Sequence, residues 1–252
     1  MKIRPGVELA ALTDVGCVRE NNEDSYGYWE SEDDASFAAL GRLVIVADGM
    51  GGHEGGQIAS RIAVDLATET YIASAEPDPQ KRLLNALDNA HRRIQQQARE
   101  NPALSAMGTT FTAFALVDAR LYFVHVGDSR LCLLREGKLR ALTRDHTLIA
   151  RLIENGVIRP EEAENHPQKH VLTSALGVAD DIEIDSSPEP VPIQSHDVLL
   201  ICTDGLWGQM NSIEMEQVLA SQSPANACHA LVQLAKSRGG PDNITLQIVR
   251  IV

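Results

Sequence analysis

The chain has 252 residues, of which 44% are hydrophobic and 23% charged, as in an ordinary soluble globular protein. Its formal net charge of −13 disfavours nucleic acid as a partner, because a phosphate backbone is bound by basic patches. No apolar run approaches the ~20 residues of a membrane span, and residues 1–6 lack the apolar core of a signal peptide. The four cysteines are far apart and form no Cys-x-x-Cys pair, so we expect neither a zinc site nor a disulfide framework. We therefore expect a cytoplasmic protein that contacts neither membrane nor nucleic acid.

In the first half of the chain, short apolar runs bounded by turn residues predict strands, and apolar residues at helical spacing predict helices. The expected elements, in order, are strands over 7–13 and 25–29, an acidic loop over 30–36, a buried strand over 43–47, and helices over 57–74 and 80–100.

The second half begins with consecutive short strands joined by two or three turn residues, which indicates an antiparallel meander. A polar segment over 147–170, interrupted by Gly156 and Pro160, is expected to be a helical excursion. The expected elements are strands over 108–117, 120–126, 130–135, 139–142, 171–176, 182–185, 198–202 and 244–252, and helices over 212–221 and 225–237. No linker or repeat divides the chain, so we expect one domain, 1–252.

The buried strand over 43–47 ends on an acid, Asp48, and a glycine-rich loop follows. Glycines at 49, 51 and 52 let the backbone turn sharply and approach a ligand closely. An uncompensated buried carboxylate would be very costly, so Asp48 requires a cation, hydrogen-bond donors or a proton. We interpret the cation as a metal ion at a catalytic site.

Four acids share this local pattern. Asp48, Asp128 and Asp204 stand at or just past the end of an apolar strand, Asp242 precedes one, and Asp24 is a fifth candidate. Several carboxylates with a glycine carbonyl suit hard divalent cations such as Mg²⁺ or Mn²⁺. An isolated Asp-Gly is more often a turn, but four such acids beside hydrophobic strands favour a site.

Arg19 is the candidate anion clamp, because a guanidinium binds two phosphate oxygens at once. A lone arginine is more commonly a surface residue. Its position in a polar cluster just before Glu23 and Asp24 favours the functional interpretation.

An ordered series of motifs spans nearly the whole chain. It resembles the motif series of the type 2C metal-dependent (PPM) serine/threonine protein phosphatases, in the form of the bacterial branch. The motifs are Gly16-x-x-Arg19-x-x-Asn22-Glu23-Asp24, Asp48-Gly49-Met50-Gly51-Gly52, Gly108-Thr109-Thr110, Gly127-Asp128-Ser129-Arg130, Asp145-His146, Thr203-Asp204-Gly205 and Asp242-Asn243-Ile244-Thr245.

The resemblance implies an α+β fold, a four-layer αββα sandwich of two antiparallel sheets flanked by helices, with residues 147–170 as a flap beside the active site. It implies hydrolysis of phosphoserine and phosphothreonine in proteins by a water activated at a pair of Mn²⁺ or Mg²⁺ ions. The partners would be phosphorylated proteins, namely a bacterial serine/threonine kinase or its substrates, and the protein would act as a monomer.

The resemblance also implies a role for each site residue. Asp48 would bridge two ions, with the carbonyl of Gly49 on one ion and Asp204 and Asp242 on the other. Glu23 and Asp24 would hold metal-bound waters, and Asp128 with Asp204 would match a third metal site. The catalytic residues would be Arg19, Asp24 and Asp48, with Arg19 on the substrate phosphate.

The general acid is the one departure from the family pattern. Many eukaryotic members carry histidine directly after the Asp-Gly, where this chain has Met50. His53 could replace it only if the loop folds back. Otherwise a metal-bound water would protonate the leaving alkoxide.

Two other functions compete. A dinucleotide-binding fold also has a strand, a glycine loop and a helix, but Glu54 stands where that fingerprint requires glycine, and a strand meander follows. A degenerate phosphatase fold that only binds phosphoproteins is the non-enzymatic alternative. Because every expected metal-ligand position is intact, the enzyme is favoured.

Overall fold

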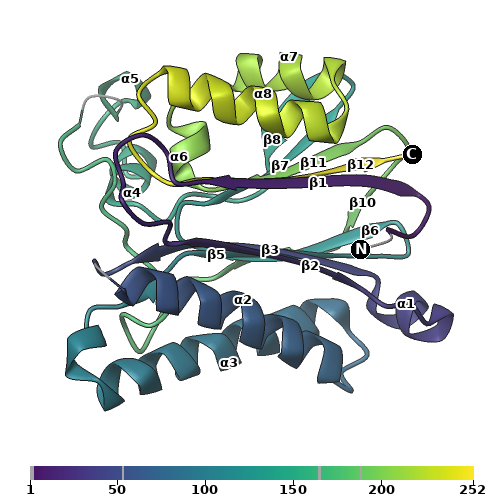
Figure 1. The fold of residues 1–252 in the computed structure, drawn as a ribbon, viewed down its shortest axis with the longest axis horizontal. Coiled ribbons are helices and arrows are strands. Elements are labelled where there is room, and N and C mark those ends of the chain that lie inside the picture. Colours follow the sequence, from purple (N-terminus) through teal and green to yellow (C-terminus); the bar gives the residue numbers. More distant parts are fainter. Residues whose placement is uncertain (1–2, 53, 164–165, 188) are drawn as a thin grey trace.

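The computed structural model describes residues 3–52, 54–163, 166–187 and 189–252. Two antiparallel sheets lie face to face, and a pair of helices covers the outer face of each (Figure 1). This arrangement is the expected αββα sandwich, so the predicted fold class is confirmed.

The first sheet has the strand order β1-β12-β11-β7-β8, and α7 and α8 pack on its outer face (Figure 1). Its elements are β1 (Val7–Asp14), β7 (Arg130–Arg135), β8 (Lys138–Ala141), β11 (Val198–Cys202), β12 (Ile244–Ile251), α7 (Ser212–Ser221) and α8 (Pro224–Ser237).

The second sheet has the order β10-β6-β5-β3-β2, with β4 pairing β3 and β9 pairing β6, and α2 and α3 cover it. Its elements are β2 (Asp24–Glu30), β3 (Arg42–Met50), β4 (Gly108–Thr109), β5 (Phe111–Val117), β6 (Arg120–Val126), β9 (Asp185–Ser186), β10 (Val191–Pro192), α2 (Gly55–Ala73) and α3 (Pro79–Glu100). The remaining elements are α1 (Asp34–Leu40), the 3₁₀ turn η1 (Pro102–Leu104), α4 (Leu148–Glu154), α5 (Pro160–Ala163) and α6 (Asp204–Trp207).

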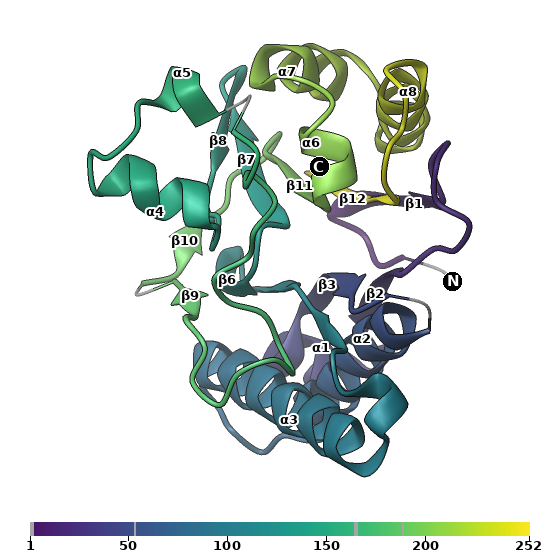
Figure 2. The same ribbon diagram turned by 90° about the vertical axis from the view of Figure 1, so that its left-hand side faces the viewer.

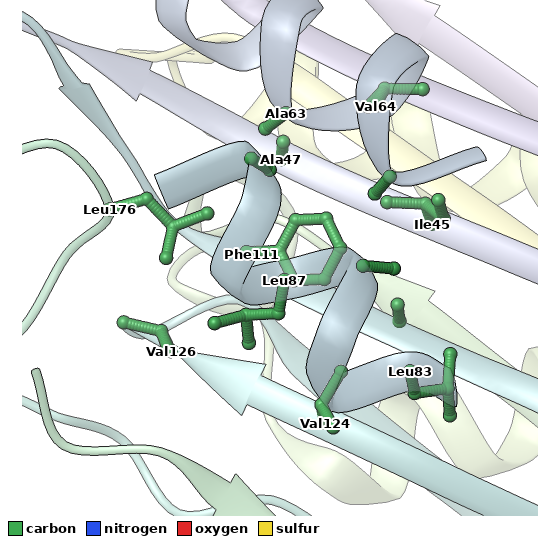
Figure 3. Packing of buried hydrophobic residues seen from close by; sticks show 14 of the residues in the cluster. Ile45, Ala47, Ala63, Val64, Leu83, Leu87, Phe111, Val124, Val126 and Leu176 are labelled. Atoms are coloured by element: carbon green, nitrogen blue, oxygen red, sulfur yellow. The ribbon is translucent and has the colours of Figure 1, made fainter. Parts of the chain in front are cut away.

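The central strand β3 is apolar on both faces because each face meets a different core. Leu43, Ile45 and Ala47 face α2 and α3, where they pack in the cluster of Figure 3. Val44 and Val46 alternate with them and pack between the two sheets. The continuous apolar run in the sequence therefore corresponds to a strand that is buried on both faces, between the helices and the other sheet.

A buried polar contact joins the two sheets across this core. The side chain of Gln247, on β12, donates through Nε2 to the carbonyls of Gly27 (3.1 Å) and Ile45 (2.8 Å) in the opposite sheet. Because a buried amide without partners would be costly, these bonds favour one relative position of the sheets.

Three expectations for local structure were wrong. The acidic loop over 30–36 gives way to α1, which begins where the Asp33 side chain accepts from the backbone N–H of Ser36 (2.8 Å). Residues 171–176 form no strand but only isolated bridges at Leu172 and Leu176. Residues 182–185 contribute only the last residue to a strand, Asp185 at the start of β9.

The expected meander is also wrong at one point. The segment Gly127–Ser129 does not make a hairpin; it carries the chain from β6 in the second sheet to β7 in the first. Gly127 has a φ of 109°, and a Cβ there would lie 2.6 Å from the Thr110 side chain. The crossing places Asp128 between the sheets at one end of the sandwich.

Candidate metal centre and active site

The predicted acids come from five separate segments but meet at one end of the sandwich, which faces the viewer in Figure 2. Antiparallel strands bring alternate starts and ends to the same edge of a stack. Asp24 opens β2, Asp48 lies near the end of β3, Asp128 follows β6, Asp204 opens α6 directly after β11, and Asp242 precedes β12.

A cavity of about 800 Å³ opens at this end of the molecule. Its lining includes nearly all the predicted site residues, and Asp24 lies buried outside it. The predicted residues on its wall are Arg19, Glu23, Asp48, Gly49, Asp128, Asp204 and Asp242. His53, the possible general acid, lies outside the described residues.

Asp48 is held at the centre of this group by its backbone. Its N–H donates to the hydroxyl of Thr110 (2.9 Å), and its carbonyl accepts from the Thr110 N–H (2.9 Å) and the Thr109 hydroxyl (2.9 Å). Burial, and then the nearby charges of Asp24 and the other acids, raise the pKa of the Asp48 carboxyl well above its ordinary value. A cation would remove this cost.

Asp24 is nearly buried and lies against the other sheet. Its Oδ2 accepts from the Thr203 hydroxyl (3.0 Å). Burial raises the pKa of Asp24 to about 7, and the charges of Asp204 and Asp242 add to the shift. Within the described part of the chain, its Oδ1 has no hydrogen-bond partner.

Asp128 is buried beside an aromatic side chain. The indole Nε1 of Trp207 donates to the Asp128 carbonyl (2.9 Å), and the guanidinium of Arg130 lies 3.5 Å from the Trp207 ring centroid. Burial, followed by the charge of Asp204, raises the pKa of the Asp128 carboxyl well above its ordinary value. An ionised Asp128, like an ionised Asp48, is therefore electrostatically unfavourable without a cation nearby.

An arginine and a histidine contact the outer acids. Arg19 donates to Oδ2 of Asp242 (2.8 Å), and its own side chain is 55% exposed. Nδ1 of His170 lies 3.4 Å from Oδ2 of Asp204. Arg19 is thus on the wall of the pocket but is held by a carboxylate in this structure.

Gly49 is required by close backbone packing. A Cβ at this position would lie 2.2 Å from the carbonyl oxygen of Gly56 and 2.5 Å from that of Glu23. The N–H of Gly49 donates to the same Glu23 carbonyl (3.1 Å). The glycine lets the loop after β3 pass between Glu23 and the start of α2.

Asn243 holds the loop that carries Arg19 and Glu23. Its Oδ1 accepts from the Glu23 N–H (2.8 Å), and its Nδ2 donates to the carbonyls of Val15 (3.0 Å) and Asn21 (2.9 Å). Asn243 stood in a quoted motif, but its role could not be predicted because all three partners lie more than 200 residues away.

The donor set fits hard divalent cations, which prefer carboxylate and carbonyl oxygens. Among the buried side-chain oxygens that lack a hydrogen-bond partner in the described residues are two from the predicted site, Oδ1 of Asp24 and Oδ1 of Asp204, and these could serve as ligands. Among those same residues, no three acidic, histidine or cysteine side chains already stand as a complete metal-binding group.

A model of the family described as Protein phosphatase 2C matches residues 18–236. The chain belongs to this family. The motif resemblance is thereby confirmed, and with it the class of enzyme, a serine/threonine protein phosphatase.

Relatives and solved structures agree with this assignment. The "Serine/threonine phosphatase stp" of Listeria welshimeri is 38% identical over 243 residues, 94% of this chain and 93% of that protein. The serine/threonine phosphatase structure of S. agalactiae has a TM-score of 0.89 and 32% identity, over 98% of this chain and 100% of that one. The catalytic domain of the phosphatase PstP, solved with two manganese ions, has a TM-score of 0.83 and 32% identity, over 98% and 99% of the two chains.

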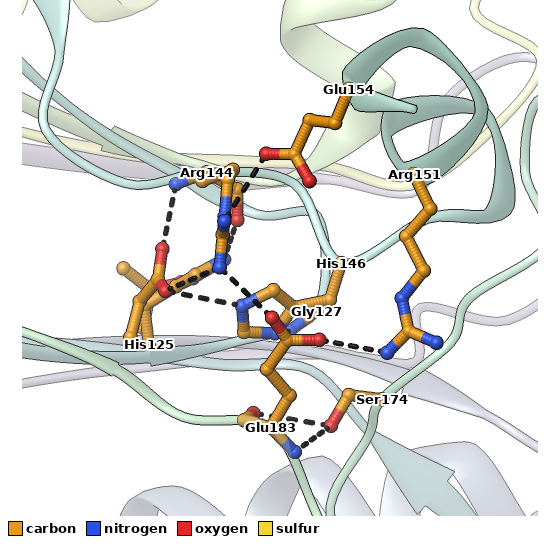
Figure 4. A network of polar contacts seen from close by, with 10 residues as sticks. His125, Gly127, Arg144, His146, Arg151, Glu154, Ser174 and Glu183 are labelled. Atoms are coloured by element: carbon orange, nitrogen blue, oxygen red, sulfur yellow. Dashed lines mark hydrogen bonds and ion pairs between the residues drawn. The ribbon is translucent and has the colours of Figure 1, made fainter. Parts of the chain in front are cut away.

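A polar network fixes the base of the segment 147–170 in this phosphatase (Figure 4). Arg144 contacts Glu154 (3.1 Å), Glu183 (2.9 Å) and Asp185 (3.4 Å), and Arg151 contacts Glu183 (2.8 Å). These contacts join the segment before α4 to the segment that returns after it.

His125 and His146 lie together under this network, with ring centroids 4.9 Å apart. Nδ1 of His125 lies 2.8 Å from the Thr112 hydroxyl and its Nε2 lies 3.0 Å from the Arg144 carbonyl, while the Gly127 N–H donates to Nδ1 of His146 (3.2 Å). Burial lowers the pKa of His125 to about 4. Both histidines thus make hydrogen bonds that hold neighbouring segments of the fold together.

Lys169 and His170 line the phosphatase pocket although the sequence gave no role to either. They stand at the end of the expected flap, in a polar segment without a strand or a glycine loop to mark a site. Their position in the pocket becomes visible only in the folded chain, where this segment lies close to Asp204.

Proposed function

We propose that this chain removes phosphate from phosphoserine and phosphothreonine in proteins, using divalent ions held by the carboxylates of the 800 Å³ pocket. The observation that carries the proposal is the meeting of acids from five segments in one place, with a family match over residues 18–236. The fold alone would not decide between an enzyme and a binding module.

Two divalent ions are the proposed cofactors, either Mn²⁺, as in the PstP structure, or Mg²⁺. Asp48, the Gly49 carbonyl, Asp204 and Asp242 would hold them. Glu23 and Asp24 would hold ordered water, and Asp128 would contribute to a third site. Such ions supply a lowered water pKa and positive charge against the phosphoryl group.

The side chains of the protein would bind and orient the phosphate. Arg19 is half exposed on the pocket wall, so it can turn its guanidinium from Asp242 toward two phosphoryl oxygens. Thr203 and Thr110 hold Asp24 and the backbone of Asp48, which keeps both acids in place while substrate enters. Positioning and charge stabilisation supply most of the catalysis in phosphoryl transfer.

The proposal extends to domain organisation, oligomeric state, partners and location. The protein is one domain with a flap over 147–170, acts as a monomer, and opposes a bacterial serine/threonine kinase or acts on the substrates of that kinase. Cys132, Cys202 and Cys228 are buried free thiols, which supports a reducing compartment such as the cytoplasm. Within the described residues, no helix combines the length and apolar character needed to cross a membrane.

Dephosphorylation of a phosphothreonine peptide, with Mn²⁺ and with a chelator, tests the proposal. We expect activity that the chelator abolishes and that Asp242→Asn also loses. Phosphopeptide binding without turnover, or binding of a dinucleotide alone, would support one of the competing functions instead.

A further inference from the structure

A second cavity of about 650 Å³ adjoins the catalytic pocket. The two share a rim formed by Lys169, His170, Gly208 and Gln209. One wall is formed by α4 and α5, and the other by α6 and the start of α7, the elements around the same end of the molecule in Figure 2. We call this cavity the flap groove.

The flap groove presents apolar side chains. Ile149 and Ile153 of α4 line one wall, and Trp207 and Met210 line the other. Such a surface favours an apolar side chain, because burying it removes carbon from water.

The charged groups of the groove are largely neutralised by each other. Arg130 donates to both oxygens of Asp145 (2.9 and 2.7 Å), and Arg238 donates to Glu214 (2.9 Å). Because these two arginines already have carboxylate partners, and Lys169 stands only at the rim shared with the catalytic pocket, an acidic side chain inside the groove would lose water without gaining a free cation there.

The wall of the groove formed by Trp207 is fixed to the catalytic pocket. Trp207 is stacked under the Arg130 guanidinium at 3.5 Å and donates to the Asp128 carbonyl (2.9 Å). The position of the groove is therefore set relative to a wall of the pocket in which the phosphate would bind.

We propose that the flap groove is a substrate subsite that takes an aliphatic side chain close to the phosphorylated residue of the phosphoprotein. The inference rests on the proposed function. Because the groove starts at the rim of the catalytic pocket, and an extended chain advances ~3.3 Å per residue, the aliphatic residue lies within about three positions of the phosphorylated one.

A panel of phosphothreonine peptides tests the subsite with the full chain and Mn²⁺. Each peptide carries leucine or glutamate at one position on either side of the phosphothreonine, in an alanine background. We expect kcat/KM at one position to be about tenfold higher for leucine than for glutamate. Turnover of p-nitrophenyl phosphate, which has no peptide chain, reports the catalytic pocket alone.

Ile153→Lys places a cation on the groove wall, and it should reverse the preference toward glutamate at that position. Hydrolysis of p-nitrophenyl phosphate should be unchanged. Val157→Lys is the matched control: it adds the same charge just beyond α4, but Val157 is 65% exposed and does not line the groove, so the leucine preference should persist. A reversal of preference is a gain that partial unfolding cannot produce.

Two results would overturn the subsite. If the unaltered protein hydrolyses all peptides but with equal kcat/KM for leucine and glutamate at every position, the groove does not read the substrate, and the proposed function stands. If no peptide and no small ester is hydrolysed with Mn²⁺, the proposed function fails and the subsite with it.

Discussion

Asp24 and Asp48 lie directly opposite each other across the antiparallel pair of β2 and β3. Two like charges in such a pair are destabilising, and burial on both sides adds to the cost. The register of the sheet therefore places the Asp24 and Asp48 carboxylates where they repel each other, and a bound cation would relieve that repulsion.

This pair leads to a prediction about pH and metal. The pKa of Asp24 is about 7 in the folded state against an ordinary 3.8, so between these values the folded state binds more protons than the unfolded state. The free energy of unfolding without metal should then fall as pH rises through this window, by up to about 1.4 kcal/mol per pH unit. Mn²⁺ requires the deprotonated acids, so its stabilising effect should grow as pH rises.

Thermal unfolding from about pH 4.5 to about pH 7.5, in chelator and in Mn²⁺, measures both effects. A metal-free melting temperature that rises steadily across this window would contradict the shift assigned to Asp24.

Asp242→Asn keeps the shape of a proposed ligand and removes its charge. We expect Mn²⁺-dependent turnover of a phosphopeptide to fall by at least about 100-fold, because charge stabilisation dominates this chemistry. The matched control is Asp118→Asn, in the turn between β5 and β6 at the opposite end of the second sheet. Its φ of 49° suits asparagine, so turnover should be retained. Equal losses in the two variants would argue against a role for the acidic pocket.

Arg19→Lys tests recognition of the phosphate. A lysine keeps the charge but cannot bind two oxygens as a planar fork, so kcat/KM should fall by about tenfold, and Arg19→Ala should lose more. Arg61→Lys, on the exposed side of α2, is the control and should leave steady-state kinetics unchanged. Unaltered kinetics in Arg19→Ala would make Arg19 only a partner of Asp242.

Gly49→Ala should destabilise the fold and inactivate the enzyme, because the new Cβ would overlap backbone atoms of Gly56 and Glu23. We expect a loss of about 1–3 kcal/mol in the free energy of unfolding. At Gly55, in the first turn of α2, the nearest atom to a Cβ is a side-chain carbon of Met107 at 3.3 Å. The urea concentration at the unfolding midpoint should therefore be nearly the same for Gly55→Ala as for the unaltered protein. Gly55→Ala is thus the control for Gly49→Ala.

His53→Ala should leave turnover of an activated aryl phosphate nearly intact, since that leaving group needs little protonation. The measurement is the rate of p-nitrophenyl phosphate hydrolysis by the variant, compared with that of the unaltered protein. A loss as large as that of Asp204→Asn would assign His53 a direct catalytic role.

The sequence by itself determined the layers and the acids. Burial of both faces makes β3 and β11 continuous apolar runs in the sequence, and the sequence located these strands to within a few residues. The ordered motifs identified the family and the six acidic residues of the predicted site. They could do so because most of these acids stand beside glycine turns and strand ends, which are visible in the sequence.

Only the tertiary structure decided which sheet each strand joins and what the acids contact. The crossing at Gly127–Ser129, the pairing of Arg19 with Asp242, and the approach of His170 to Asp204 depend on segments far apart in the chain. The flap groove likewise exists only where α4 meets α6 and α7. Local propensity carries no information about such contacts, because their free energy comes from burial and charge pairing between elements that meet only after the sheets have stacked.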